Sequence, residues 1–472
     1  MRHWLDVALV TTLLVAAGFL VRGTIPGGPY PYDEADYMYA ASLGVTANAT
    51  DTPSLWLGDF IRIGLNRGRD SSQRTSLSEM VRSSGDVNLY RHWHGPLQVY
   101  WLMMTSAAKG DEATMRSLTL VFHGVTFLVI YFGCLWIVPE TWGRTAGVLA
   151  SSLYLFSYTH LRTAVEIAPH AIFALFAVAT LFLVAKMIAT GNLRYWYLAV
   201  ATSALGFVTM EVTLVLLITM AACCWRERVC RGPGVRIVSR SVALFLGIVL
   251  LLWPAALLRL SFVKAYLFMA YLAIARSGPW GQVSLFETWR LRVANAPLEW
   301  ALLGLGVAAY FARSRRDEQL RQLGVPFLIY GVLMVLALLR VTTDSPRYSS
   351  PFLPAFHCLA GISLAAVMER WPSKVRTIAV AVVVLGLSVS VWSKLPHALS
   401  GDDNVDRSML ALLRTQDIEG KQIWVPQSKL PTVHYYFPQA RLRGYLNETD
   451  IAGNLDGVLR IAPLRWESGA IR

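Results

Sequence analysis

Long apolar runs separated by short polar segments follow one another along most of the chain. The first run, residues 5–21, has one charge near its start and is long enough to cross a bilayer. Further runs follow at residues 118–138, 145–158, 170–188, 195–225, 242–258, 298–312, 325–339, 352–368 and 378–392. Because backbone in lipid must satisfy its hydrogen bonds internally, this pattern predicts an all-α polytopic membrane bundle of about 11 to 13 spans.

Two apolar segments depart from a simple crossing pattern. Residues 96–108 are short for a crossing, and Pro96 suits the first position of a helix. Residues 195–225 are too long for one crossing, and a single helix would bury Glu211 at its middle, which is costly. We therefore expect the first segment to dip into the membrane and the second to form two short helices that turn near Glu211. This scheme places Glu166 on the outer side, whereas one full crossing by each segment would place it in the cytoplasm, and both schemes fit the basic loops.

A large polar loop is expected over residues 22–95, on the outer side of the membrane. Charges and serines over residues 47–91 exclude that part from lipid. Residues 36–41 can form a helix along the interface. Ahead of them, the adjacent acids Asp33-Glu34 are expected in a rigid loop, as part of the Gly/Pro-rich segment that starts at residue 26. A carboxylate beside hydrocarbon is costly unless it is hydrated or paired, so this pair indicates a functional site, against the alternative of a solvated helix end.

The pattern turns polar from about residue 395. A capped helix and two candidate strands follow, at residues 404–414, 422–425 and 433–437. The sequence therefore predicts a transmembrane domain over residues 1–394 and a small outer α/β domain over residues 395–472. The second shows no nucleotide-binding glycine pattern and is expected to serve as a lid or docking module.

Composition and charge agree with a membrane protein. Of the 472 residues, 55% are hydrophobic and only 15% are charged, which excludes an ordinary soluble globular protein. The formal net charge is +13, but the basic residues cluster in loops at 226–240, 313–321 and 370–376. Such loops indicate cytoplasmic connections and not a nucleic-acid partner. The five cysteines show neither a disulfide framework nor metal-ligand spacing.

Four motifs in this order resemble the GT-C membrane glycosyltransferases. They are the acid pair Asp33-Glu34, His94-Gly95-Pro96-Leu97, Glu166-Ile167-Ala168-Pro169-His170-Ala171 and Arg347-Tyr348-Ser349-Ser350-Pro351. The resemblance is strongest to the protein O-mannosyltransferase and aminoarabinose transferase branch, which uses polyprenyl-phosphate sugars. It implies a polyprenyl-phosphate sugar donor, a lipid, glycan or protein acceptor, and membrane lipids as further partners. It also implies a bacterial inner membrane with the site facing the periplasm.

This chemistry requires a base near the acceptor and a cation near the departing phosphate. We assign the base to Asp33 and the phosphate contact to Arg347, beside Tyr348, because a guanidinium binds phosphate in two places. We also count Glu34 and Glu166 among the candidate catalytic residues, with three roles possible. They could bind sugar hydroxyls, bind a divalent cation, or tune Asp33.

His92, His94 and Glu211 complete the candidate substrate-binding residues. The two histidines are expected to act as interfacial hydrogen bonders in preference to metal ligands, and no metal site or certain cofactor is assigned. Glu211 either faces the cavity or pairs with a neighbouring helix.

The chain departs from the family pattern at several of these positions. Gly95 stands where the family often has a proline, and Ala168 and His170 stand where it often has arginine and tyrosine. Glu211 replaces a lysine found in many members. These changes bear on which sugar and acceptor are used.

A transporter or flippase is the alternative from another functional class, with Glu166 and Glu211 lining a path between Pro-broken helices. No inverted repeat is visible in the sequence, and the large outer loop and tail favour the enzyme.

The loop assignments predict membrane topology directly. A reporter fused after Trp392 should be active outside the cytoplasm, whereas one fused within residues 226–240 should be cytoplasmic, because the basic loops alternate with the acid-pair loop. A cytoplasmic tail would contradict the proposed location of the site.

Overall fold

The structure, a computed structural model, describes most of the chain. The described residues are 2–22, 25–50, 94–106, 111–226, 234–258, 263, 283–343, 345–395, 403–416, 418, 422–426, 429–445 and 458–460.

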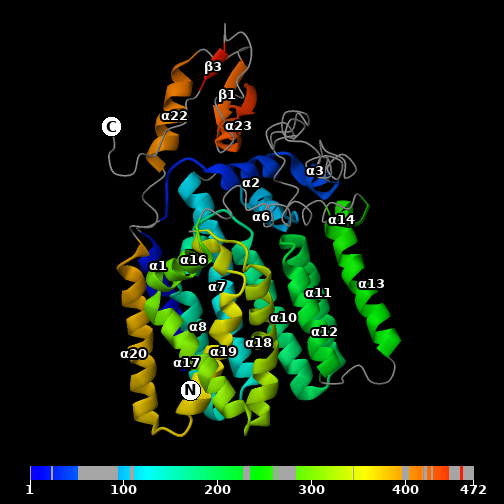
Figure 1. Cartoon of the computed structure of the whole chain (residues 1–472), viewed down its shortest axis with the longest axis vertical. Helices are drawn as coiled ribbons and strands as arrows, with labels where there is room; N and C mark the ends of the chain where they lie inside the picture. Colours follow the sequence, from blue (N-terminus) through cyan, green and yellow to red (C-terminus); the bar gives the residue numbers. More distant parts are fainter. Residues whose placement is uncertain are drawn as a thin grey trace.

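An upright bundle of helices forms the body of the molecule (Figure 1). Its long members are α1 (Arg2–Arg22), α7 (Glu112–Ile137), α8 (Glu140–Leu155), α10 (His170–Thr190), α11 (Leu193–Thr209), α12 (Thr213–Arg226), α13 (Gly234–Leu252), α17 (Pro297–Ser314), α18 (Glu318–Ala337), α19 (Leu353–Met368) and α20 (Ser373–Trp392).

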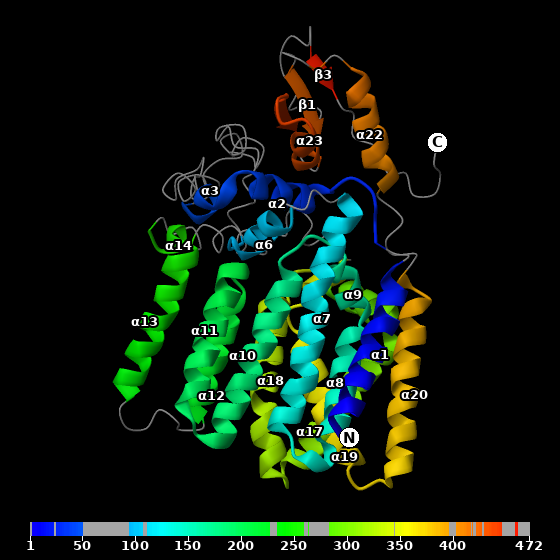
Figure 2. The same cartoon turned by 180° about the vertical axis from the view of Figure 1, so that it is seen from behind.

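Short helices gather at one end of this bundle (Figures 1 and 2). The helices α2, α3 and α6 lie across that end, and we call them the cap helices. Their bounds, with those of the other short helices, are α2 (Tyr32–Ser42), α3 (Gly44–Thr50), α6 (Leu97–Ser106), α9 (Tyr158–Ala164), α14 (Pro254–Leu258), α16 (Leu285–Asn295) and the 3-10 helix η3 (Pro346–Ser349).

The C-terminal segment sits beyond the cap helices and contains a three-stranded sheet (Figure 1). Its elements are α22 (Asp403–Thr415), β1 (Gln422–Pro426), α23 (Leu430–Tyr436), β2 (Arg441–Tyr445) and β3 (Val458–Arg460). Strand β1 is central and pairs in parallel with both neighbours, Ile423 lying opposite Leu442 and Leu459. Helix α23 packs on the cap helix α2.

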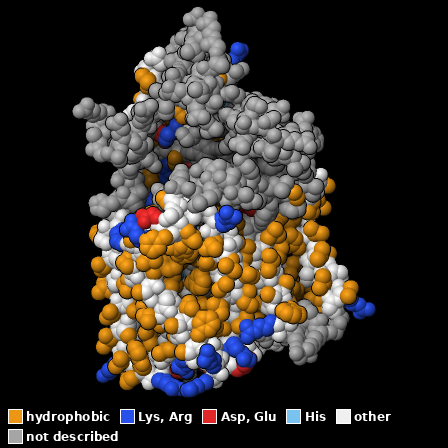
Figure 3. Space-filling model, viewed as in Figure 1, with side chains coloured by type: hydrophobic (Ala, Val, Ile, Leu, Met, Phe, Trp, Pro, Cys, Tyr) orange, Lys and Arg blue, Asp and Glu red, His pale blue; other side chains and the backbone are white. Residues whose placement is uncertain are grey.

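The sides of the bundle are apolar, as a membrane requires. Among the described residues, five helices are long and apolar enough to cross a membrane by length and composition, namely α7, α10, α13, α18 and α20. Figure 3 shows hydrophobic side chains covering the flank of the bundle, while Lys and Arg gather at the end opposite the cap helices. Exposed basic residues at that end include Arg315, Arg316, Arg370 and Lys374. The expected all-α polytopic membrane fold is confirmed.

The long apolar segment containing Glu211 is divided as expected. Helix α11 ends at Thr209 and α12 begins at Thr213, so Glu211 lies in the turn between them. Helix α6 has only 10 residues, which is too short to cross. The expected division near Glu211 is confirmed, and α6 lies across the cap end of the bundle (Figure 1).

Two local expectations were wrong. The acid pair does not lie in a Gly/Pro-rich loop, because Asp33 and Glu34 occupy the first turn of α2, where carboxylates favour the positive end of a helix dipole. The segment at 433–437 is not a strand. It belongs mostly to α23, where Leu430 and Val433 bury one helical face against the sheet. The helix at 404–414 and the strand at 422–425 are confirmed.

Helix α19 is the packing centre of the bundle, since it contacts α8, α17 and α18. Glycines allow two of these contacts. A Cβ on Gly361 would overlap the backbone of Ala150 in α8, and a Cβ on Gly306 of α17 would overlap the backbone of Ala360. The helices therefore meet at backbone distance, the close approach that small residues permit between membrane helices.

Replacing Gly361 should separate two central helices. We expect Gly361→Ala to lower the free energy of unfolding by about 1–3 kcal/mol, because α8 must move to admit the methyl group. The matched control is Gly304→Ala, since a Cβ at Gly304 meets nothing within 4 Å. Thermal unfolding midpoints in detergent measure both, and equal midpoints would contradict this close packing.

Candidate active site

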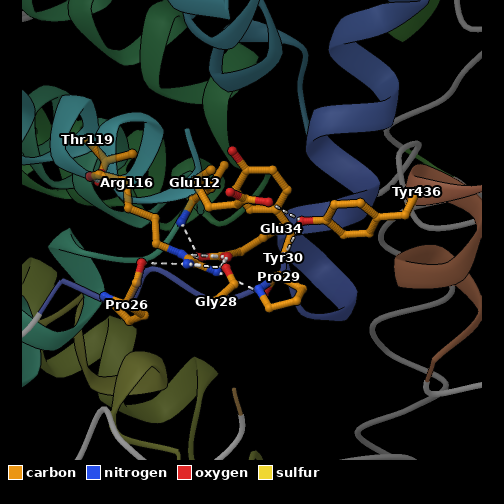
Figure 4. A network of polar contacts seen from close by, with 10 residues as sticks. Pro26, Gly28, Pro29, Tyr30, Glu34, Glu112, Arg116, Thr119 and Tyr436 are labelled. Atoms are coloured by element: carbon orange, nitrogen blue, oxygen red, sulfur yellow. Dashed lines mark hydrogen bonds and ion pairs between the residues drawn. The ribbon is translucent and has the colours of Figure 1, made fainter. Parts of the chain in front are cut away.

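A buried ion pair joins the acid pair to the membrane bundle (Figure 4). Arg116, in the first turns of α7, is 2% exposed and donates from Nε and Nη2 to Glu34 Oε2, at 2.9 and 2.5 Å. The other carboxylate oxygen, Oε1, accepts the backbone N–H of Ile167 at 2.9 Å. A bidentate guanidinium pair with its remaining atoms satisfied is the arrangement in which a buried salt bridge is tolerated. Glu34 is thereby held in a single orientation.

The same arginine also fixes the chain that leads into α2. Its Nη1 donates to the carbonyls of Pro26 and Gly28, at 2.7 and 2.9 Å, and its Nη2 donates to Pro29 O at 3.2 Å. The ring of Tyr30 lies against the guanidinium, with 5.3 Å between its centroid and Arg116 Cζ. The Gly/Pro-rich segment is therefore wrapped around one buried cation.

The C-terminal segment contacts this network through Tyr436 (Figure 4). The Tyr436 hydroxyl donates to Glu112 Oε1 at 2.8 Å and accepts the backbone N–H of Tyr30 at 3.1 Å. The rings of Tyr30 and Tyr436 stack with centroids 6.3 Å apart. Helix α23 is thereby connected to the residues that hold Glu34.

Asp33, the other member of the acid pair, pairs with the candidate phosphate-binding arginine, Arg347. Its Oδ2 lies 2.5 Å from Arg347 Nη1, with side chains 36% and 27% exposed. Arg347 comes from η3, more than 300 residues along the chain, and its Nη2 lies 3.4 Å from the Tyr348 hydroxyl. Burial alone would lower the pKa of Arg347, but Asp33 and Tyr348 outweigh it and hold that pKa above its ordinary value.

Glu166 adds a second carboxylate beside Arg347. It lies between α9 and α10, with its Oε1 3.8 Å from Arg162 Nε and its side chain 28% exposed. Burial raises the pKa of Glu166 above its ordinary value, and Arg347 and Arg162 oppose that shift only in part. The raised pKa favours the protonated form of Glu166, which can donate a hydrogen bond as well as accept one.

His94 and Glu211 form a third pair at the same end of the bundle. His94 Nδ1 lies 2.8 Å from Glu211 Oε2, and Glu211 is 2% exposed. Burial alone would lower the pKa of His94, but Glu211 outweighs it and raises that pKa, which favours the imidazolium that donates to Glu211. The ring of Tyr37 stacks 6.3 Å from that of His94. Of the two positions expected for Glu211, facing the cavity or pairing with a neighbouring segment, the structure therefore shows the pairing.

The structure also shows why a glycine follows His94. A Cβ on Gly95 would overlap the carbonyl of Val208, in the last turn of α11. Only glycine permits the return segment to approach α11 this closely.

Most of the candidate residues come together, although they lie far apart in the sequence. Asp33, Glu166 and Arg347 interact electrostatically, and Asp33 and Arg347 also act on His94. All these residues lie at helix ends or connections on the cap side of the bundle (Figure 1). His92 lies outside the described residues.

Sequence reasoning missed Arg116 and Tyr436. A signal for Arg116 was present, because it is a lone arginine at the start of a long apolar run and an intramembrane charge needs a partner. Tyr436 carried no comparable signal, since its contact depends on how the C-terminal segment docks.

The arrangement offers a partly exposed carboxylate, a cation and a half-buried acid within one cluster. No group of three or more His, Cys, Asp or Glu side chains is placed to hold a metal among the residues that the structure describes. The chemistry that these side chains can supply is proton acceptance by Asp33, anion binding by Arg347 and hydrogen bonding by Glu166.

Comparison with solved structures identifies the fold. ArnT from Cupriavidus metallidurans bound to undecaprenyl phosphate matches with a TM-score of 0.59 at 11% identity, over 96% of this chain and 89% of that chain. The apo form of the Archaeoglobus fulgidus oligosaccharyltransferase matches with a TM-score of 0.52 at 11% identity, over 94% of this chain and 65% of that chain. Both are GT-C glycosyltransferases, so the expected GT-C fold is confirmed. At these identities the likeness concerns the fold alone.

No protein-family model and no curated protein sequence matches the chain.

Removing Arg116 should cost far more than removing an exposed arginine. We expect Arg116→Ala to lower the free energy of unfolding by about 3–5 kcal/mol, because it leaves the Glu34 carboxylate buried and unpaired. Arg144→Ala is the matched control, since Arg144 pairs with Asp6 while 43% exposed and should contribute about 1 kcal/mol or less. Thermal unfolding in detergent compares the two. A smaller loss for Arg116→Ala than for Arg144→Ala would contradict this assignment.

Proposed function

We propose that this protein is a membrane glycosyltransferase that moves a sugar from a polyprenyl-phosphate donor to a hydroxyl or amine of a lipid, glycan or protein acceptor. The observation that carries the proposal is the Asp33–Arg347 ion pair at the cap end of a GT-C fold. It supports the proposal because a carboxylate, which can accept a proton, lies beside a guanidinium, which can bind phosphate. The ArnT structure with undecaprenyl phosphate supports a lipid-phosphate donor for this fold.

Arg347 would bind the donor phosphate. Its planar guanidinium can bind two phosphate oxygens at once, so the phosphate competes with the carboxylate of Asp33 for the same cation. The donor phosphate is a diester with one negative charge, and it gains a second as the sugar leaves, so Arg347 binds the departing group more strongly than the donor. Donor binding would thereby draw Arg347 away from Asp33. This order of events leaves Asp33 as a free carboxylate only when the donor is in place.

Asp33 would then act as the base. The acceptor oxygen or nitrogen forms a bond to the anomeric carbon while its proton passes to Asp33, and the bond from that carbon to the phosphate oxygen breaks. The bonding electrons leave with the polyprenyl phosphate, whose charge Arg347 stabilises. Tyr348, beside Arg347, can donate its hydroxyl hydrogen to the same phosphate.

The remaining carboxylates take different roles in this scheme. Glu34 is 4% exposed and fully occupied by Arg116 and Ile167, which suits positioning of α2 better than contact with substrate. Glu166 is partly exposed and suits a sugar hydroxyl. A divalent cation at Glu166 would need oxygen ligands from the substrate as well. His94, with Glu211 behind it, would present a cationic ring edge to the donor.

The proposed location follows from the two ends of the bundle. Basic residues gather opposite the cap helices, and basic loops favour the cytoplasm. The site would then face the periplasm or cell exterior from a bacterial inner membrane.

The test is a transfer reaction with purified protein. Labelled polyprenyl-phosphate sugars are incubated with lipid, glycan and peptide acceptors, and the label is expected in the acceptor while free polyprenyl phosphate accumulates. Uptake of the same donor into vesicles without release of polyprenyl phosphate would favour the transporter alternative.

Substituting the base should abolish turnover without abolishing donor binding. Asp33→Asn keeps the size of the side chain but removes the proton-accepting charge, and should lower kcat by roughly two to four orders of magnitude. Glu34→Gln should also impair transfer, but with a loss of thermal stability that Asp33→Asn does not share. Turnover and donor binding are measured on the same preparations, and near-normal kcat in folded Asp33→Asn would overturn the base assignment.

Substituting Arg347 should act mainly on donor use. We expect Arg347→Ala to lower kcat/KM for the donor by about 10- to 100-fold, the usual effect of losing a charge-assisted contact, and Arg347→Lys to lose less. Arg162→Ala is the control, because Arg162 is a neighbouring cation that lies 3.8 Å from Glu166 and 32% exposed. Equal losses for Arg162→Ala and Arg347→Ala would contradict a specific phosphate contact.

A further inference from the structure

Helix α16 lies at the cap end of the bundle, immediately before α17 (Figure 1). It has 11 residues and is not among the helices that could span a membrane. Three of its apolar side chains are exposed, Phe286 at 77% and Leu285 and Val293 at 42% each. Exposed apolar side chains on a short helix at a bundle end indicate contact with the boundary between lipid tails and headgroups.

Arg292 is the exceptional residue of this helix. Its side chain is only 7% exposed, and Nε and Nη2 are buried with no hydrogen-bond partner in the described part of the chain. Trp289 lies 4.9 Å from the guanidinium carbon, but an aromatic face attracts the cation without accepting its in-plane N–H groups. A buried guanidinium with free donors is costly, so its environment calls for an anion.

A second arginine on α16 shows the ordinary arrangement. Arg290 is exposed and bidentate with Glu287, at 2.7 and 2.6 Å. Arg292 has no such carboxylate, and burial lowers its pKa to about 10 with no neighbouring acid opposing the shift. Among the residues that the structure describes, none supplies an acceptor for the buried Nε and Nη2 of Arg292.

A second cation lies at the same end of α16. Lys394, which follows α20, donates from Nζ to Ala294 O at 2.5 Å, two residues from Arg292. Trp289 also contacts Trp300 and Phe352, with ring centroids 5.7 and 6.1 Å away. Tryptophans beside cations are typical of the headgroup level of a membrane.

We propose that Arg292 binds the phosphate of an anionic membrane lipid, with Lys394 adding positive potential and the exposed apolar side chains of α16 contacting the acyl chains. A guanidinium suits this ligand because phosphate oxygens accept two of its N–H groups at once. Cationic pockets between membrane helices bind anionic headgroups in this manner. In the described part of the chain no hydrogen bond or ion pair joins Arg292 to Asp33 or Arg347, and the proposal does not depend on the proposed transfer reaction.

The apolar surroundings identify the source of the phosphate. A free phosphate ion would gain nothing from Phe286, Leu285 and Val293, whereas a lipid covers them with its chains. The ligand is therefore a phospholipid with net negative charge, such as phosphatidylglycerol, bound at the edge of the bundle.

The test measures lipid binding to the full-length protein in detergent. Delipidated protein is titrated with phosphatidylglycerol, with phosphatidylcholine or with inorganic phosphate, and bound lipid is counted by native mass spectrometry alongside the thermal unfolding midpoint. We expect saturable binding of phosphatidylglycerol that raises the midpoint, and little effect from the other two. Arg292→Gln should weaken that binding roughly tenfold or more.

Two further variants make the result decisive. Arg290→Gln removes an equal charge from the same helix and should bind phosphatidylglycerol as the parent protein does. Arg292→Lys keeps the charge and should bind more tightly than Arg292→Gln, and it replaces that variant if it does not fold. Equal binding by Arg290→Gln and the Arg292 variants would overturn the proposal. Stabilisation by inorganic phosphate matching that of the lipid would overturn the lipid as ligand.

Discussion

The bidentate pair between Arg116 and Glu34 is the interaction on which the cap end of this protein depends. It is buried, so its attraction is little weakened by water, and each additional donor or acceptor of the two groups is occupied by backbone. Through it, α7 determines where α2 begins. Since Asp33 immediately precedes Glu34, the orientation of the exposed carboxylate follows from the fixation of the buried one.

The proposed site is an assembly of chain segments that only the fold brings together. Asp33 comes from α2, Arg347 from η3 and Glu166 from the connection before α10, and the bundle brings all three to one end. The C-terminal segment reaches the same region through Tyr436, whose hydroxyl contacts Glu112 and Tyr30. Movement of that segment would therefore displace the residues that hold Glu34. This connection gives the C-terminal segment a physical route to Asp33, the residue proposed as the base.

Much of the fold could be predicted because a membrane restricts which secondary structures can cross it and how long they must be. Apolar length identified the helices, and the cost of burying Glu211 in mid-helix correctly divided α11 from α12. The features that could not be predicted depend on tertiary contacts, which the local sequence pattern does not show. The segment at 433–437 has strand propensity, yet most of it is helical because Val433 and Leu430 bury one face in the C-terminal core. Motifs indicated Asp33 and Arg347 separately, but no spacing showed that they form an ion pair, or that Arg116 would bind Glu34.

The central claim is that Arg347 exchanges the carboxylate of Asp33 for the phosphate of a lipid donor. An experimental structure of the protein with bound polyprenyl phosphate tests it most directly. Our account predicts phosphate oxygens within hydrogen-bond distance of the Arg347 guanidinium, and a separation between Arg347 Nη1 and Asp33 Oδ2 well beyond the 2.5 Å of the unliganded pair. Phosphate bound elsewhere, with the Asp33–Arg347 pair intact, would contradict it.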